Sequence, residues 1–231
     1  MGVKLPGSGQ YLHGLQPEHS SCVYCFRMFK TLELPLNTHT LSEPVDREAQ
    51  WLLKAVQGDS TAFTRLVETY QRPVYNLCYR MLGNAEDAED AAQETFLRAY
   101  KSLRRFDQSR PFATWLLSIA AHYCIDQLRR KDPAVTSIDD MLVPDVPEIA
   151  PDMDTRLGAK QEQQRVRAVL DALEPIDRAA VVMYYWYDYS YDEICRELGL
   201  TMGAVKSRLH RARKAMAIRW SQMETAIGTS S

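Results

Sequence analysis

Apolar residues recur at the 3.6-residue spacing of an α-helix over two long stretches of this 231-residue chain. Pro73 is expected to kink or divide the first long helix, because proline lacks the N–H that a helix interior needs. Gly83 then predicts its end, and Asn84 predicts the cap of the next helix. The inward positions of the first helix are predicted to be Phe63, Leu66, Val67, Tyr70, Val74, Leu77, Cys78 and Met81.

The same period continues through the rest of both stretches. The helix after Asn84 is predicted to run to about Leu103, and Pro111 suits the first turn of a helix that reaches Lys131. In the second stretch we expect helices from about Arg156 to Leu173 and from Ile176 to Tyr187. Strand-like alternation is nowhere convincing, so the fold class is all-α. Inward positions after Asn84 are predicted to be Ala88, Ala92, Phe96 and Tyr100.

Two short helices joined by a tight turn follow Tyr187. Ser190 and Glu193 have the spacing of a capping box, Gly199 suits a helix end, and Thr201 suits the next cap. The second helix is strongly basic, and a basic second helix is the form that enters a DNA major groove. Its predicted DNA contacts are Thr201, Lys206, Ser207, Arg208, His210, Arg211, Arg213 and Lys214.

Charge divides the chain into regions, although the formal net charge is only -2. Residues 201–223 hold six Lys or Arg and no acid, whereas residues 132–156 hold four prolines and seven acids. We therefore expect two small helical domains, residues 46–131 and 157–222, joined by a flexible acidic linker over 132–156. Residues 1–45 are expected to be a disordered extension, and 223–231 a polar tail.

A second candidate nucleic-acid surface interleaves arginines with aromatic residues. Arginines hold phosphates and rings stack on bases in single-stranded DNA binding. The alternative is a core role, because Trp115, Leu116, Ile119 and Tyr123 share helical spacing. Both readings can hold, with the loop from Phe106 to Pro111 and the polar face of the following helix as the nucleic-acid surface. The candidate contacts are Arg105, Phe106, Arg110, Thr114, Trp115, Ser118 and His122.

An acidic helix start precedes this surface. Acids in a first helical turn are favoured by the helix dipole, which alone would explain them. Their alternative role is a polar face for a partner protein around Leu97. The candidate residues of that face are Asp87, Asp90, Gln93, Glu94, Leu97 and Arg98.

In combination, residues 47–222 resemble an extracytoplasmic-function sigma factor of the sigma-70 family. The segment Asp90–Tyr100 resembles the region 2 helix that binds core RNA polymerase, and Phe112–Ala120 resembles the part that opens and reads the -10 element. The segment Val205–Arg213 resembles the region 4 helix that reads the -35 element. The resemblance implies core polymerase and promoter DNA as partners, with an anti-sigma factor as a further one.

Two departures from the family pattern affect readout. Family members often have Asn where this chain has His122, and Thr where it has Ala204. The target sequence therefore cannot be copied from a relative.

Other classes find little support. The longest nearly apolar run, Phe112–Ile125, has 14 residues, short of the roughly 20 that a membrane helix needs. No phosphate-binding glycine loop or nucleophile–base spacing is visible, so we expect no enzyme activity and no cofactor. With no secretory signal either, the expected location is the cytoplasm.

Two rivals stay open at this stage: an ordinary helix-turn-helix operator-binding regulator, and a redox or metal sensor. The second would use His19, Cys22 and Cys25, which have zinc-ligand chemistry but no second pair of ligands.

Overall fold

The computed structural model describes residues 45–131 and 153–228, and every element within those ranges is helical. They belong to one compact unit, Glu33–Ser231. Predictions that fall in residues 1–44 and 132–152, including the disordered extension, most of the acidic linker and the His19, Cys22 and Cys25 cluster, lie outside the described residues.

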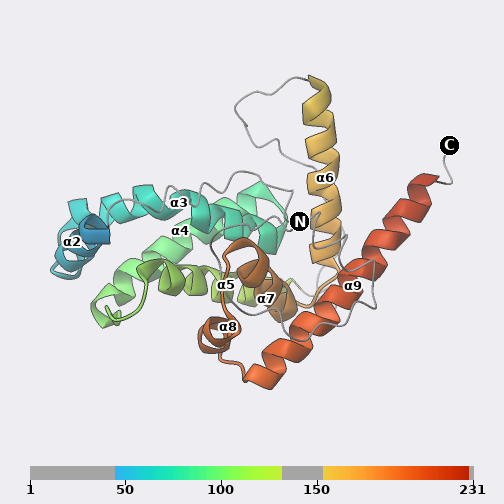
Figure 1. Ribbon diagram of the computed structural model, residues 1–231. Helices are drawn as coiled ribbons and strands as arrows, with labels where there is room; N and C mark the ends of the chain where they lie inside the picture. The colour runs from blue at the N-terminus through green and yellow to red at the C-terminus, as the bar shows by residue number, and fades with distance from the viewer. Residues whose placement is uncertain (1–44, 132–152, 229–231) are drawn as a thin grey trace, which may run out of the picture. The chain divides into compact units, whose positions relative to one another are not determined.

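Four helices and a short 3-10 turn form the first domain (Figure 1). The long helix α3 packs against α2, α4 and α5, and α4 packs against α5. The core between them holds Tyr70, Val74, Leu77 and Met81. In chain order the elements are α2 Val45–Val56, α3 Ser60–Leu82, α4 Ala85–Ser102, η2 Leu103–Arg105 and α5 Phe112–Arg130.

The caps of this domain follow the sequence. Asp59 accepts hydrogen bonds from the backbone N–H groups of Thr61 and Ala62 at the start of α3. Gly83 takes the left-handed conformation, with φ 81°, and Asn84 accepts from the N–H of Asp87. The predicted boundary between α3 and α4 is therefore confirmed, because each cap satisfies backbone groups that the helix ends leave open.

The structure differs from two expectations for this domain. Of the two outcomes expected at Pro73, a kink or a division, the division is excluded, because α3 is continuous from Ser60 to Leu82; Val74 and Leu77 beside it are fully buried, and their packing outweighs the hydrogen bond that proline removes. Tyr100 is not inward but 48% exposed, because its ring packs edge-on against Phe63 at 4.9 Å near the surface.

The second domain has four helices: α6 Met153–Asp171, α7 Pro175–Trp186, α8 Tyr191–Leu198 and α9 Met202–Gly228. Helix α9 packs against α6, α7 and α8. Its core includes Val182 and Met183 from α7, Ile194 from α8 and Leu209 from α9. None of the helices in the described ranges is long and apolar enough to cross a membrane.

Hydrogen bonds join the two domains within this unit. The guanidinium of Arg178, on α7, donates to the backbone carbonyl of Met81 at 2.6 Å. The hydroxyl of Tyr187 donates to the carbonyl of Pro73 at 2.6 Å. Burial away from water lowers the pKa of Arg178, which Asp171 partly offsets by a 3.0 Å ion pair. Arg178 thus places a buried cation against the end of α3.

Candidate nucleic-acid and partner interfaces

The α8–α9 unit is a helix-turn-helix, as predicted. Ser190 and Glu193 form a complete capping box: Glu193 N–H donates to Ser190 Oγ at 3.2 Å, and Ser190 N–H donates to Glu193 Oε2 at 2.8 Å. Hydrogen bonds from Ser190 hold the pKa of Glu193 below its usual value. Gly199, with φ 64°, ends α8, and Thr201 Oγ1 accepts from Ala204 N–H at 3.3 Å. These caps fix the turn that sets α9 against α8.

Helix α9 has one buried and one exposed face. Val205, Leu209, Ala212 and Met216 are buried against the other helices. At about 100° per residue, the exposed predicted contacts within α9, after the capping residue Thr201, fall within an arc of about 140° on the opposite side. We call these residues the α9 stripe: Lys206, Ser207, His210, Arg211 and Lys214.

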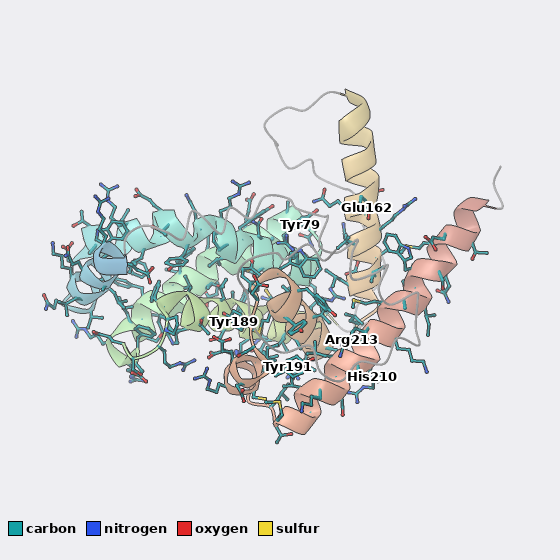
Figure 2. All side chains as sticks on the ribbon, viewed as in Figure 1. Tyr79, Glu162, Tyr189, Tyr191, His210 and Arg213 are labelled. Atoms are coloured by element: carbon teal, nitrogen blue, oxygen red, sulfur yellow. The ribbon has the colours of Figure 1, made fainter. Side chains whose placement is uncertain are left out.

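Two predicted DNA contacts flank the α9 stripe rather than belong to it. Arg208 is 28% exposed, and its Nη1 donates to Oδ1 of Asp177 on α7 at 2.6 Å. Arg213 donates from Nε to the carbonyl of Leu209 at 3.0 Å. Figure 2 shows His210 and Arg213 along α9. The structure thus places both guanidiniums against the protein's own groups, and the sequence did not indicate the role of Asp177.

In the aromatic–basic segment, the structure places two predicted DNA contacts inside the domain. Phe106 is 7% exposed and packs against Phe112 and Trp115, with ring centroids 5.7 and 4.8 Å away. Ser118 is buried, and its hydroxyl donates to the carbonyl of Trp115 at 2.8 Å. The loop from Asp107 to Pro111 must therefore present other groups to a ligand, because Phe106 anchors it.

The remaining members of the segment reach the surface. Arg105 and His122 are exposed, while Thr114 and Trp115 are half-buried. The Nδ1 atom of His122 lies 2.8 Å from the carbonyl oxygen of Ser118. Trp115 packs against Phe106 and Phe112 and is still half-exposed, so its ring can both pack in the cluster and stack on a ligand.

Arg110 and Thr114 also contact the second domain. Arg110 donates to the carboxylate of Glu197 on α8, whose side chain is 4% exposed. The hydroxyl of Tyr189 donates to the carbonyl of Thr114 at 3.2 Å. Two candidate strand-binding residues are therefore engaged by the helix-turn-helix domain.

The acidic segment forms one face of α4. On a helical wheel the six candidates span an arc of about 140°, with Gln93 at one edge and Arg98 at the other. Leu97, at its centre, is 54% exposed. Arg98 donates to Glu94 at 2.7 Å and lies 4.7 Å above the ring of Tyr123. We call Asp87, Asp90, Gln93, Glu94, Leu97 and Arg98 the α4 face.

Asp87 differs from the rest of the α4 face because it holds the domain together. Lys131, at the end of α5, forms an ion pair with its carboxylate, and Asn84 also donates to it. Burial alone would raise the pKa of Asp87, but the hydrogen bonds from Lys131 and Asn84 lower it below its usual value. Asp87 therefore joins the start of α4 to the end of α5.

A groove of about 520 Å³ runs beside the α4 face, between α3 and α4. Gln93 lies in it together with residues of α3 that the sequence did not single out as candidate contacts, although Val67 is among the predicted inward positions. No local signal marks them, because they come together only when α3 packs on α4. The lining is Val67, Gln71, Arg72, Tyr75, Glu89, Ala92, Gln93 and Phe96.

Metal-ligand chemistry does not gather in the described ranges. There, no group of three or more His, Cys, Asp or Glu side chains could hold a metal ion. Cys78 and Cys124 are free and buried side by side between α3 and α5, where the Cys78 hydrogen bond and burial raise the pKa of Cys124. The sensor hypothesis concerns His19, Cys22 and Cys25, which lie outside these ranges.

Family comparisons agree with this geometry. Residues 66–133 match the family model described as Sigma-70 region 2, and residues 163–216 match Sigma-70, region 4. The two matches cover the aromatic–basic segment with the α4 face and the helix-turn-helix, in that order. They define a sigma-70 class of transcription factor.

Relatives narrow the class. The chain is 35% identical over 176 residues to the ECF RNA polymerase sigma factor SigW of Bacillus subtilis, covering 69% of this chain and 89% of SigW. It is 35% identical over 184 residues to the ECF sigma factor SigE of Mycolicibacterium smegmatis, covering 75% and 68%. The chain belongs to the extracytoplasmic-function RNA polymerase sigma factors. It acts in promoter recognition and transcription initiation, with core RNA polymerase and promoter DNA as partners.

Solved structures share the fold. CnrH in complex with the cytosolic domain of CnrY superposes with a TM-score of 0.56 at 24% identity, covering 74% of this chain and 96% of CnrH. RpoE in complex with the anti-sigma factor NepR from Bartonella quintana gives a TM-score of 0.54 at 19% identity, covering 69% and 96%. At these identities the likeness concerns the fold alone.

Proposed function

We propose that three surfaces divide the work of initiation: the α4 face binds core RNA polymerase, the exposed part of the aromatic–basic segment holds the melted -10 strand, and the α9 stripe reads duplex -35 DNA. The observation that carries the proposal is the α9 stripe, five polar or basic side chains on one arc of a capped second helix. Exposed Lys, Arg, Ser and His at the N-terminal part of such a helix match the donors that base edges and phosphates accept.

The proposed -10 role rests on the surface that Trp115, His122 and Arg105 form together. Trp115 offers a half-exposed ring beside a packed cluster, and Arg105 offers a charge for phosphate. An unstacked base gains binding energy from such a ring without readout of its sequence. His122 adds a hydrogen-bonding group on the same helix, which supplies readout.

The two DNA surfaces cannot serve both elements while the domains are in contact. Elements two helical turns apart are separated by roughly 70 Å, and the 21 residues between Lys131 and the start of α6 at Met153 would reach at most roughly 75 Å if extended. We infer that binding to polymerase separates the domains and releases Arg110 from Glu197. Because α6 begins at Met153, the linker is shorter than the sequence predicts, and its 21 residues over 132–152 just suffice for this.

The polymerase performs the chemistry, and this chain supplies binding energy and readout without an enzyme activity of its own. It acts in the cytoplasm, where that polymerase works. Because the fold relatives CnrH and RpoE are found with CnrY and NepR, we also propose that an anti-sigma factor binds this chain.

The test is run-off transcription with purified core RNA polymerase on a library of genomic fragments. The wild-type chain is expected to start transcripts from a defined subset of fragments. Lys206→Ala or Arg211→Ala should reduce those transcripts, whereas Arg219→Ala, an exposed arginine of α9 outside the α9 stripe, should not. Initiation at no fragment would overturn the proposal, and equal losses for all three variants would overturn the assignment of the α9 stripe.

A further inference from the structure

One acidic side chain, that of Asp177, packs against α9 beside the α9 stripe. Asp177 is the third residue of α7, and its side chain is 9% exposed. Its two oxygens face α9: Oδ1 accepts from Arg208 Nη1 at 2.6 Å, and Oδ2 lies 3.9 Å from Arg211 Nη2. A nearly buried carboxylate needs such partners, because an unpaired charge away from water is costly.

The two arginines are not equivalent. Arg208 is 28% exposed and makes the short contact, whereas Arg211 is 60% exposed and stands at the outer limit of an ion pair. On the helical wheel Arg208 lies about 60° beyond Arg211, toward the buried face. Its charge is therefore neutralised by Asp177, while that of Arg211 is directed to solvent.

We propose that Asp177 is a positioning residue for -35 recognition: it ties Arg208 to α7 and so fixes the rotation of α9 that presents the α9 stripe to DNA. This inference rests on the proposed role of α9 in -35 binding. Arg208 then links α9 to α7, and the phosphate and base contacts come from Arg211 and its neighbours in the α9 stripe.

The competing explanation is that Asp177 only stabilises the start of α7 through the helix dipole. The two explanations differ in what Asp177→Asn does to Arg208. If Asp177 holds Arg208, the substitution frees a guanidinium beside the DNA. If Asp177 serves only the dipole, the number of phosphate contacts does not change.

The experiment measures binding of the full-length chain to a 30-base-pair duplex of mixed sequence as a function of salt. Each phosphate contact contributes about 0.9 to the slope of log K against log salt concentration. We expect Asp177→Asn to steepen the slope by up to about 0.9, and Arg211→Gln to flatten it by about 0.9. The double variant Asp177→Asn, Arg208→Gln should keep the wild-type slope.

A matched control separates positioning from folding. Ser190→Ala weakens the same domain by removing the α8 cap but leaves Asp177, Arg208 and Arg211 in place. It should lower the thermal midpoint without changing the slope. The proposal is overturned if Asp177→Asn leaves the slope unchanged, or if the double variant flattens it as Arg211→Gln does.

Specificity gives the second readout. With holoenzyme on a promoter fragment recovered as above, Asp177→Asn should lower the ratio of affinity for that fragment over one with a scrambled -35 segment by about tenfold. Removal of an acid near DNA would by electrostatics alone strengthen binding to both. An unchanged affinity ratio overturns the positioning role of Asp177. Failure of the wild-type holoenzyme to initiate at any fragment speaks instead against the proposed function, and the salt dependence of binding then tests the role of Asp177 by itself.

Discussion

The Nδ1 atom of His122 lies 2.8 Å from the backbone carbonyl oxygen of Ser118, one turn earlier on α5. A carbonyl oxygen only accepts, so Nδ1 donates the hydrogen in this contact, and Nε2 is the ring nitrogen on the opposite edge. The contact fixes the ring's orientation, and the exposed edge of His122 is thereby available to a base.

His122→Ala should weaken open-complex formation by about 1–3 kcal/mol, the range of a single base contact. His122→Asn, the residue that family members often have, retains a donor and an acceptor and should lose less. Permanganate footprinting of the melted strand measures the effect, with -35 binding as the internal reference. Equal losses in footprint and -35 binding would contradict a local role.

Leu97→Ala should reduce affinity for core RNA polymerase by up to about tenfold, because covering an exposed leucine side chain removes apolar surface from water, worth about 1.5–3 kcal/mol for a full side chain. Leu53→Ala is the matched control, since Leu53 on α2 is 50% exposed against 54% for Leu97. Biolayer interferometry with immobilised core polymerase compares them. The same loss for both leucines would show that the α4 face is not the contact.

Phe106→Ala should destabilise the first domain by about 3–5 kcal/mol, the cost of truncating a buried phenylalanine. Arg105→Ala, at the exposed neighbouring position, should leave the free energy of unfolding unchanged and weaken binding to single-stranded DNA. Urea denaturation and a fluorescence binding assay separate the two effects. A stable Phe106→Ala protein with impaired DNA binding would return Phe106 to the list of direct contacts.

The lowered pKa of Asp87 predicts that the free energy of unfolding falls at acidic pH. Its folded-state pKa lies below the usual value of 3.8, so its contribution is present above that pH and is lost as the pH falls through the folded-state pKa. The difference in unfolding free energy between wild type and Asp87→Asn should narrow from pH 6 to pH 3. In a Lys131→Met background the difference should be smaller at every pH, and no narrowing would contradict the ion pair.

Local signals predicted the element boundaries that caps mark, whereas α6 starts before Arg156, at Met153, and α9 continues past residue 222 to Gly228. Gly83, Asn84, Ser190 and Gly199 each satisfy backbone groups at their own helix end, so a short window of sequence suffices to find them. The buried side of α9 follows the same local rule, because Val205, Leu209 and Ala212 recur at helical spacing.

Contacts between distant segments could not be predicted in this way. Arg208 is basic like its neighbours, and only the packing of α7 on α9 brings it to Asp177, 31 residues away. The burial of Phe106 depends similarly on Phe112 and Trp115 across a loop. Pro73 is tolerated because tertiary packing outweighs local propensity.

The ion pair between α7 and α9 bears on retargeting this factor to other promoters. A designer who transplanted only the solvent-facing positions of α9 into a different relative would inherit that relative's helix orientation. Asp177, Arg208 and the α9 stripe therefore have to be transplanted together.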